Sequence, residues 1–215
     1  MTNIILFLLE IIGTMAFSTS GALVAIKSRF DIFGVIVIGC VTSVGGGITR
    51  DILIGNVPPT IFSRWYIIMI AILTAIVVFL IAYRKRKKFK ETQGKIEHIN
   101  NIFDAIGLAA FTVMGTELAF TNGISSNGFL SVTSGVLTGV GGGLLRDIFT
   151  ETPPYIFTKH IYAVAAIMGA TLYYFTRLYV NNTLLPSIIA IIFIIIIRIL
   201  ATKYRWDLPK INIEE

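Results

Sequence analysis

Charged side chains are scarce in this chain of 215 residues: Asp, Glu, Lys and Arg make up 14% of it, whereas 55% is hydrophobic. Soluble globular proteins are about 45–50% apolar and about 25% charged, so this composition excludes an ordinary cytosolic enzyme and a disordered region. The single cysteine, Cys40, excludes an internal disulfide. With a mean hydropathy of +0.81, the chain is expected to be a polytopic all-α membrane protein lying almost wholly in lipid.

Catalytic patterns are also missing from the sequence. The two histidines, His98 and His160, have no second ligand at a metal-binding spacing. There is no G-x-S-x-G motif, and no Ser, His and Asp set can be assembled at one membrane depth. We therefore expect neither an enzyme nor a protein that holds a cofactor or a resident metal.

Seven apolar segments, each long enough to cross a bilayer, follow one another along the chain. The predicted transmembrane helices cover approximately residues 3–26, 32–54, 62–83, 101–121, 128–149, 157–177 and 184–202. The N-terminus has no basic region and no small-residue cleavage site, so it is expected to be a retained first span rather than a signal peptide.

Basic residues are concentrated in one loop, which predicts the orientation of the chain. The run Arg84–Lys90 directly follows an apolar segment, which is typical of a cytoplasmic loop near anionic lipid rather than of a nucleic-acid-binding surface. The same orientation places six further basic residues in the cytoplasm: Lys27, Arg29, Lys159, Lys203, Arg205 and Lys210. Only Arg64 and Arg177 clearly fall on the opposite side, so we expect the N-terminus outside and the C-terminus in the cytoplasm.

The most informative feature is an internal repeat. The triplet Gly45–Gly47, followed by Arg50-Asp51, recurs 96 positions later as Gly141–Gly143, followed by Arg146-Asp147. Each copy contains three spans, an odd number, so the second copy enters the membrane from the opposite side as an inverted repeat. The expected organisation is a first copy (1–83), a basic cytoplasmic linker (84–100), a second copy (101–177), and a seventh helix with its tail (178–215).

Three consecutive glycines in the middle of a span weaken the helix by roughly 3 kcal/mol relative to alanine. We therefore predict that the second and fifth helices are kinked and broken at their triplets, and that the freed carbonyls face a polar path. The candidate pore-lining residues are Gly45, Gly46, Gly47, Gly141, Gly142, Gly143, Thr42, Ser43 and Thr138. The alternative is close helix packing alone, because Gly39, Ser43 and Gly47 are spaced by four residues.

Arg50 and Arg146 follow the triplets, and a charge at this depth is expected to face the interior and to be paired. Because neighbours at i,i+1 diverge on a helix, we expect Arg50 not to pair with Asp51, nor Arg146 with Asp147. The expected partners are acidic residues elsewhere: Asp51 and Asp147 across the repeat, or Glu10, Asp104 and Glu117. The alternative for both arginines is a position at a span end, with the side chain reaching the headgroups.

Three acidic residues lie inside the first and fourth segments. Glu10 and Asp104 are equivalent in the repeat, and both are expected to occupy the first turn of a helix, where the helix dipole favours a negative charge. Glu117 has no acidic counterpart, because Leu23 takes its place in the first copy. Glu117 is therefore a candidate for a gating or charge-pairing role, together with Arg50, Asp51, Arg146 and Asp147.

The duplicated G-G-G-x-x-R-D-I motif, with P-P-x-I-F downstream of each copy, resembles the prokaryotic relatives of the trimeric intracellular cation (TRIC-type) channels. This group is also described as a two-copy glycine-transporter domain family, and the resemblance covers residues 5–177. It implies a homotrimer of seven-helix subunits in the cell membrane. Each subunit would contain its own pore, surrounded by the first, second, fourth and fifth helices and passing potassium or sodium ions.

Two functions remain open at this point. A glycine transporter would need a donor for a carboxylate and an acceptor for an ammonium group, which Arg50 or Arg146 could supply with Asp51, Asp147 or Glu117. A potassium-preferring channel needs only a continuous wet path with weak cation contacts, and the resemblance favours it. A purely structural membrane protein would conduct nothing and would tolerate alanine at Gly46 and Gly142.

Overall fold

The computed structural model describes residues 2–85, 93–121, 127–158 and 161–206, and these residues form a bundle of α-helices. Seven long helices are present in them: α1 (Thr2–Lys27), α2 (Ile32–Leu53), α3 (Trp65–Arg84), α5 (Gln93–Ala119), α6 (Gly128–Phe149), α8 (Tyr162–Tyr179) and α9 (Leu184–Tyr204). Two short helical turns, η1 (Thr60–Ser63) and α7 (Tyr155–Thr158), precede α3 and α8. The predicted all-helical fold is confirmed.

Six of the long helices are apolar and long enough to cross a membrane, and α8 is the exception. Its 18 residues are enough to cross a bilayer, but it is less apolar than the spans of the other six, with Arg177 and several tyrosines in its sequence. Because α8 packs against α5, α6 and α9, its polar groups contact protein. That α8 crosses the membrane stays a prediction.

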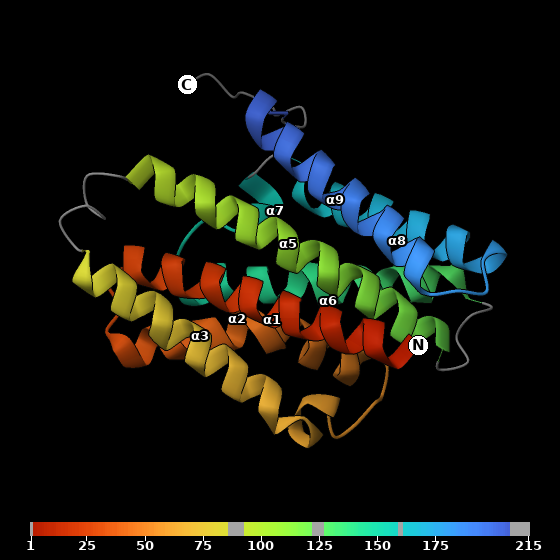
Figure 1. The fold of residues 1–215 in the computed structure, drawn as a ribbon, viewed down its shortest axis with the longest axis horizontal. Coiled ribbons are helices and arrows are strands. Elements are labelled where there is room, and N and C mark those ends of the chain that lie inside the picture. The colour runs from red at the N-terminus through yellow and green to blue at the C-terminus, as the bar shows by residue number, and fades with distance from the viewer. Residues whose placement is uncertain (1, 86–92, 122–126, 159–160, 207–215) are drawn as a thin grey trace, which may run out of the picture.

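The bundle consists of two three-helix units and an additional helix (Figure 1). α1 and α5 pack side by side, and α2 and α6 pack against each other and against α1 and α5 respectively. α3 contacts α1 and α2, and α8 contacts α5 and α6 in the corresponding way. α9 covers α5 and α8, which confirms a seventh helix outside the two repeated units.

The helices α2 and α6 cross at their glycine triplets, where their backbones touch. A Cβ on Gly46 would fall on the carbonyl oxygen of Thr138, and a Cβ on Gly142 would fall on that of Thr42. Any side chain at either position would therefore push the two helices apart. This reciprocal contact explains the middle glycine of each triplet by close packing.

The expectation that both helices break at their triplets was wrong. α2 is continuous from Ile32 to Leu53, and α6 from Gly128 to Phe149, so neither triplet interrupts its helix. The weak helix propensity of glycine is offset here by the tight contact between the two backbones. Whether the two helices bend at these points stays a prediction.

Aromatic rings and glycines interlock in the same reciprocal way between α1 and α5. The ring of Phe17 lies against Gly107, and the ring of Phe111 lies 3.1 Å from where a Cβ of Gly13 would be. The two rings contact each other with centroids 5.3 Å apart. These four residues are equivalent in pairs in the repeat, so the sequence symmetry is carried into the packing.

Two acidic residues lie deeper in their helices than the sequence predicted. α5 begins at Gln93 rather than near residue 101, so Asp104 is about three turns into it. Glu10 is about two turns into α1, which begins at Thr2. The interpretation of Glu10 and Asp104 as first-turn charges was therefore wrong: α5 starts well before the predicted position, and Glu10 lies about two turns into α1 even from the predicted start.

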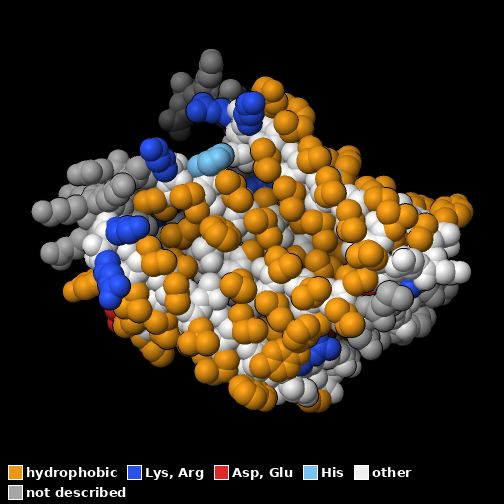
Figure 2. All heavy atoms as spheres, viewed as in Figure 1, with side chains coloured by type: hydrophobic (Ala, Val, Ile, Leu, Met, Phe, Trp, Pro, Cys, Tyr) orange, Lys and Arg blue, Asp and Glu red, His pale blue; other side chains and the backbone are white. Residues whose placement is uncertain are grey.

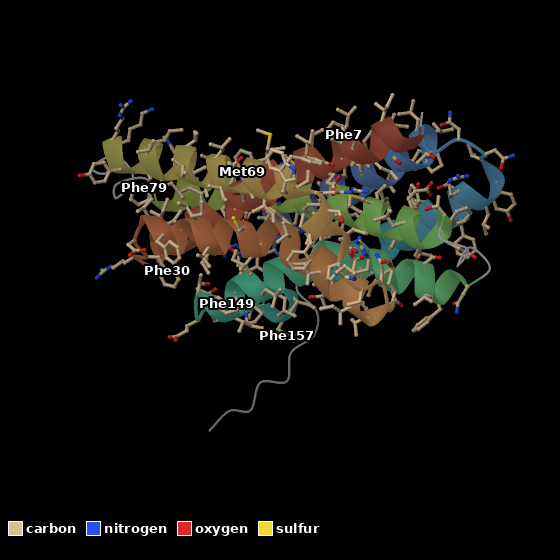
Figure 3. All side chains as sticks on the ribbon, turned by 90° about the horizontal axis from the view of Figure 1, so that it is seen from below. Phe7, Phe30, Met69, Phe79, Phe149 and Phe157 are labelled. Carbon is tan, nitrogen blue, oxygen red and sulfur yellow. The ribbon has the colours of Figure 1, made fainter. Side chains whose placement is uncertain are left out.

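The outside of the bundle is apolar. Phe7, Met69 and Phe157 lie on the outside in Figure 3, with exposed fractions of 44%, 43% and 75%. Figure 2 shows hydrophobic side chains across one face of the molecule. A continuous apolar surface of this extent is suited to contact with lipid or with another protein.

Basic side chains on the face in Figure 2 gather mainly at the end where, in Figure 1, α1 and α3 end and α5 begins. In the basic run predicted to face anionic lipid, Arg84 and Lys85 are exposed, whereas residues 86–90 lie outside the described residues. Lys159, His160 and Lys210 also lie outside them.

The crossing of α2 and α6 makes a direct prediction. Gly46→Ala and Gly142→Ala should each lower the thermal unfolding temperature of the detergent-solubilised protein, because the new methyl group meets a backbone carbonyl. Gly47→Ala is the matched control: a Cβ there meets only an Arg50 nitrogen at 3.8 Å, so stability should stay close to wild type. Equal unfolding temperatures for all three variants would contradict the backbone contact.

Candidate functional site

A buried ion pair lies in the last turn of α2. Arg50 donates to Asp51 Oδ1 through Nη2 at 2.7 Å and through Nε at 2.9 Å, and both side chains are 3% exposed. Arg50 Nη1 also reaches α6, where it donates to Thr138 Oγ1 at 3.4 Å. The first motif arginine thus connects its own helix to the partner helix of the crossing.

A larger network surrounds the equivalent arginine of α6. Arg146 Nε donates to Asp147 Oδ1 at 2.8 Å, and its Nη1 donates to Asp104 Oδ1 on α5 at 2.7 Å. The same Nη1 donates to Ser20 Oγ on α1 at 2.6 Å. Arg146 is completely buried, and two carboxylates compensate its charge.

Both motif arginines pair with the aspartate that follows them, so the expectation that i,i+1 neighbours diverge was wrong here. The pairs lie in the last turns of α2 and α6, where the long arginine side chain curls back to the carboxylate. The predicted interior position of Arg50 and Arg146 agrees with their burial, at 2% and 0% exposure. Among the other candidate partners, Asp104 binds Arg146.

The two aspartates also accept hydrogen bonds from the backbone of the segment that follows each helix, directly after its Pro-Pro pair. Asp51 Oδ2 accepts from the backbone N–H of Thr60 at 2.9 Å, and Asp147 Oδ2 accepts from that of Tyr155 at 2.8 Å. Thr60 and Tyr155 directly follow the two Pro-Pro pairs. The duplicated Pro-Pro pairs mark the segments that contain these donors, but not their hydrogen bonds to the two aspartates.

The second cluster adjoins a cavity of about 910 Å³, called the vestibule here. It lies where α1 and α3 end and α5 begins, and its lining includes Lys27, Tyr83, Asn100 and Tyr155. Hydrogen bonds run from its wall to the arginine: Arg146 donates to Ser20, Ser20 to Asn100 at 2.8 Å, and Asn100 to Tyr155 at 3.1 Å. The Tyr155 ring also covers the Arg146 guanidinium, at 4.7 Å.

The first cluster adjoins a much smaller cavity of about 30 Å³, called the outer cavity here. Its lining includes Glu10, Thr14, Gly47, Arg50 and Thr138. This volume is enough for one or two water molecules. Arg50 thus lines the outer cavity, whereas Arg146 does not line the vestibule and contacts its wall through the Tyr155 ring, and the crossing of α2 and α6 lies between the two arginines.

The candidate hydroxyl residues are buried at the crossing. Thr42 donates to Ile38 O at 2.6 Å, and Thr138 donates to Ser134 O at 2.6 Å, so both hydroxyls bond to their own helices. Ser43 lies beside the outer cavity, where its hydroxyl is 2.7 Å from Gly39 O. Of the triplet glycines, Gly47 is the one that lines either of these two cavities.

Glu117 lies apart from both arginine clusters. It accepts from Tyr173 Oη at 2.9 Å and from Arg177 Nε at 3.2 Å, and it is 3.4 Å from the hydroxyl of Thr183. Tyr173 and Arg177 belong to α8, and Thr183 directly precedes α9. Glu117 therefore ties α5 to the last two helices.

A third buried arginine, Arg198, lies on α9, directly after four consecutive isoleucines. Arg198 is 1% exposed, and its guanidinium lies 4.7 Å from the centre of the Tyr162 ring. The Tyr162 hydroxyl in turn lies beside Gly143 and near Arg146 Nη2. Neither residue could be identified from the sequence, because Arg198 lies outside the two repeated units and Tyr162 lies in the second unit but outside its duplicated motifs.

Comparisons with known proteins agree with this architecture. The family model described as "Glycine transporter" matches residues 7–83 and 101–177. An Escherichia coli relative, the UPF0126 inner membrane protein YadS, is 32% identical over 98% of both chains. A UPF0126 membrane protein of Deinococcus radiodurans is 38% identical over 75% of this chain and 72% of its own.

Solved structures of similar fold are described as TRIC channels. A crystal structure of a prokaryotic TRIC channel in 0.5 M KCl has a TM-score of 0.84 at 35% identity and covers 96% of this chain and 100% of its own. The TRIC trimeric intracellular cation channel orthologue from Rhodobacter sphaeroides has a TM-score of 0.82 at 27% identity, covering 93% and 98%.

Neutralising Asp104 and neutralising Glu10 should lower the free energy of unfolding by different amounts. Asp104→Asn should lower the free energy of unfolding by about 1.5–3 kcal/mol, because it weakens a charged hydrogen bond to a fully buried guanidinium that still keeps Asp147 as a partner. Glu10→Gln, its repeat equivalent, should cost distinctly less, because its partner Arg64 is 39% exposed. Reversible unfolding in mixed micelles measures both, and equal costs would contradict the assigned pairing.

Proposed function

The chain belongs to the glycine-transporter (UPF0126) family of multi-pass membrane proteins, and we propose that it forms a cation channel with one pore in each subunit. The observation that carries this proposal is the pair of cavities next to the two motif arginines. The similarity to TRIC cation channels, over more than nine-tenths of both chains, supports the same conclusion.

The proposed path runs from the vestibule past Arg146, along the crossing of α2 and α6, and past Arg50 to the outer cavity. The four central helices, α1, α2, α5 and α6, carry many buried hydroxyls. Those in the described residues include Thr14, Ser18, Ser20, Thr42, Ser43, Thr112, Thr116, Ser131, Ser134 and Thr138. Hydroxyl oxygens provide the weak, multiple contacts that let a cation enter and leave.

The two arginines do not give the path a positive charge. Arg146 faces two carboxylates, Asp104 and Asp147, so its cluster carries one negative charge in excess. Arg50 is paired with Asp51, and Glu10 lines the same outer cavity. Because the acidic groups balance or exceed the guanidinium charges, cations are tolerated at both positions.

The finer features of the proposal are a preference for potassium and assembly as a homotrimer in the cell membrane. The permeant potassium or sodium ions would be the only ligands of the pore, and anionic lipid would bind near Arg84–Lys90. Assembly as a trimer is supported by the similar Rhodobacter sphaeroides protein, which is described as trimeric. The basic residues at the vestibule end favour placing that end in the cytoplasm, with the N-terminus outside.

A second candidate function is the transport of glycine or a similar small amino acid. Arg50 and Glu10 line one cavity and offer a donor for a carboxylate and an acceptor for an ammonium group. Alternating access would then open the vestibule and the outer cavity in turn. The family description is consistent with this alternative.

Planar-bilayer recording of the purified protein in asymmetric KCl separates the two functions. We expect single-channel steps that reverse near the potassium equilibrium potential, and no change in step size when glycine is added to one side. Bilayers without protein provide the baseline. The absence of steps, together with saturable uptake of labelled glycine into proteoliposomes, would replace the channel by a transporter.

A further inference from the structure

Glu10 and Asp104 occupy the same place in the two halves of the chain, but their partners differ. Asp104 is completely buried and contacts Arg146 at 2.7 Å. Glu10 does not contact the equivalent Arg50; its Oε2 instead accepts from Arg64 Nη1 at 2.7 Å. The inverted repeat is therefore broken at this ion pair.

The ion pair between Glu10 and Arg64 is weak. Arg64 lies between η1 and α3, and its side chain is 39% exposed, whereas that of Glu10 is 8% exposed. Ion pairs with such an exposed arginine are worth little, because water competes for the guanidinium. The bond between Glu10 and Arg64 can consequently be exchanged at low cost.

The space between Glu10 and Arg50 is the outer cavity itself. Both residues line it, together with Gly47 and Thr138. In the second half the carboxylate of Asp104 contacts the guanidinium directly, and no such space lies between them. The two halves thus present two arrangements of one structural unit, with the acid held away in one and in contact in the other.

We propose that Glu10 is a gate-positioning residue that exchanges between Arg64 and Arg50. Bound to Arg64, it leaves the outer cavity open. Bound to Arg50, it reproduces the contact between Asp104 and Arg146 and fills the cavity. This proposal rests on the channel function proposed above and adds a gate at the end of the path near Arg50.

Two single variants and their combination test the exchange in bilayer recordings. Arg64→Gln releases Glu10 toward Arg50 and should lower the open probability by about twofold to fivefold. Glu10→Gln cannot close the cavity and should raise the open probability. The double variant should behave as Glu10→Gln does, because Arg64 acts only through Glu10. The unitary conductance should stay unchanged in Arg64→Gln, because Arg64 is not among the residues that line the outer cavity.

Arg64→Lys is the matched control, because it keeps a positive charge within reach of Glu10 and should keep the wild-type open probability. The exchange is refuted if Arg64→Gln lowers the open probability equally in the presence and absence of Glu10. It is also refuted if both single variants change the open probability in the same direction.

A chemical readout tests the same exchange without any conductance. Gly47→Cys, in a chain with Cys40→Ala, places one thiol in the outer cavity, where a Cβ meets only Arg50 Nη2 at 3.8 Å. In detergent, a small charged thiol reagent should modify it more slowly with Arg64→Gln and faster with Glu10→Gln. Opposite changes in rate from a protein that does not conduct would refute the channel but support the exchange. Identical rates in all backgrounds would refute the exchange even if the protein conducts.

Discussion

The contact between the backbones of α2 and α6 at Gly46 and Gly142 is the constraint on which the remaining structure depends. Because the two helices touch without side chains between them, their following turns carry Arg50 and Arg146 away from the crossing on opposite helices. Each arginine then finds its carboxylate within its own motif and a further partner outside it. One close approach thus positions both charged clusters.

The Arg50 and Arg146 clusters are related by the repeat, but the arginine of one has more bound partners than the arginine of the other. The Arg146 cluster is sealed by Asp104, Ser20 and the Tyr155 ring, and it faces a wide vestibule. The Arg50 cluster has one bound carboxylate and an unfilled space beside it. In an inverted repeat, such a difference between equivalent sites indicates that the two ends of the path are in different states.

The helical spans and the two-copy repeat could be predicted from the sequence, because apolar segments indicate the spans and duplicated motifs indicate the symmetry. The triplets were correctly recognised as special, but propensity alone suggested a break, whereas contact with the opposite backbone keeps each helix intact. The pairing of Arg50 with Asp51 was missed because helical spacing ignores the reach of a long side chain at a helix end. The contact between Arg198 and Tyr162 joins α9, which lies outside the repeat, to α8, so no sequence pattern indicated it.

The central claim is that one conducting path passes both arginines, near its two opposite ends. The most direct test is the rectification of single-channel currents from Arg50→Gln and Arg146→Gln in spheroplast membrane patches, where all channels share one orientation. Removing a positive charge near one end raises cation entry from that end, so the two variants should rectify in opposite directions, and Arg→Lys at each position should not. Rectification in the same direction, or none in either variant, would contradict the account.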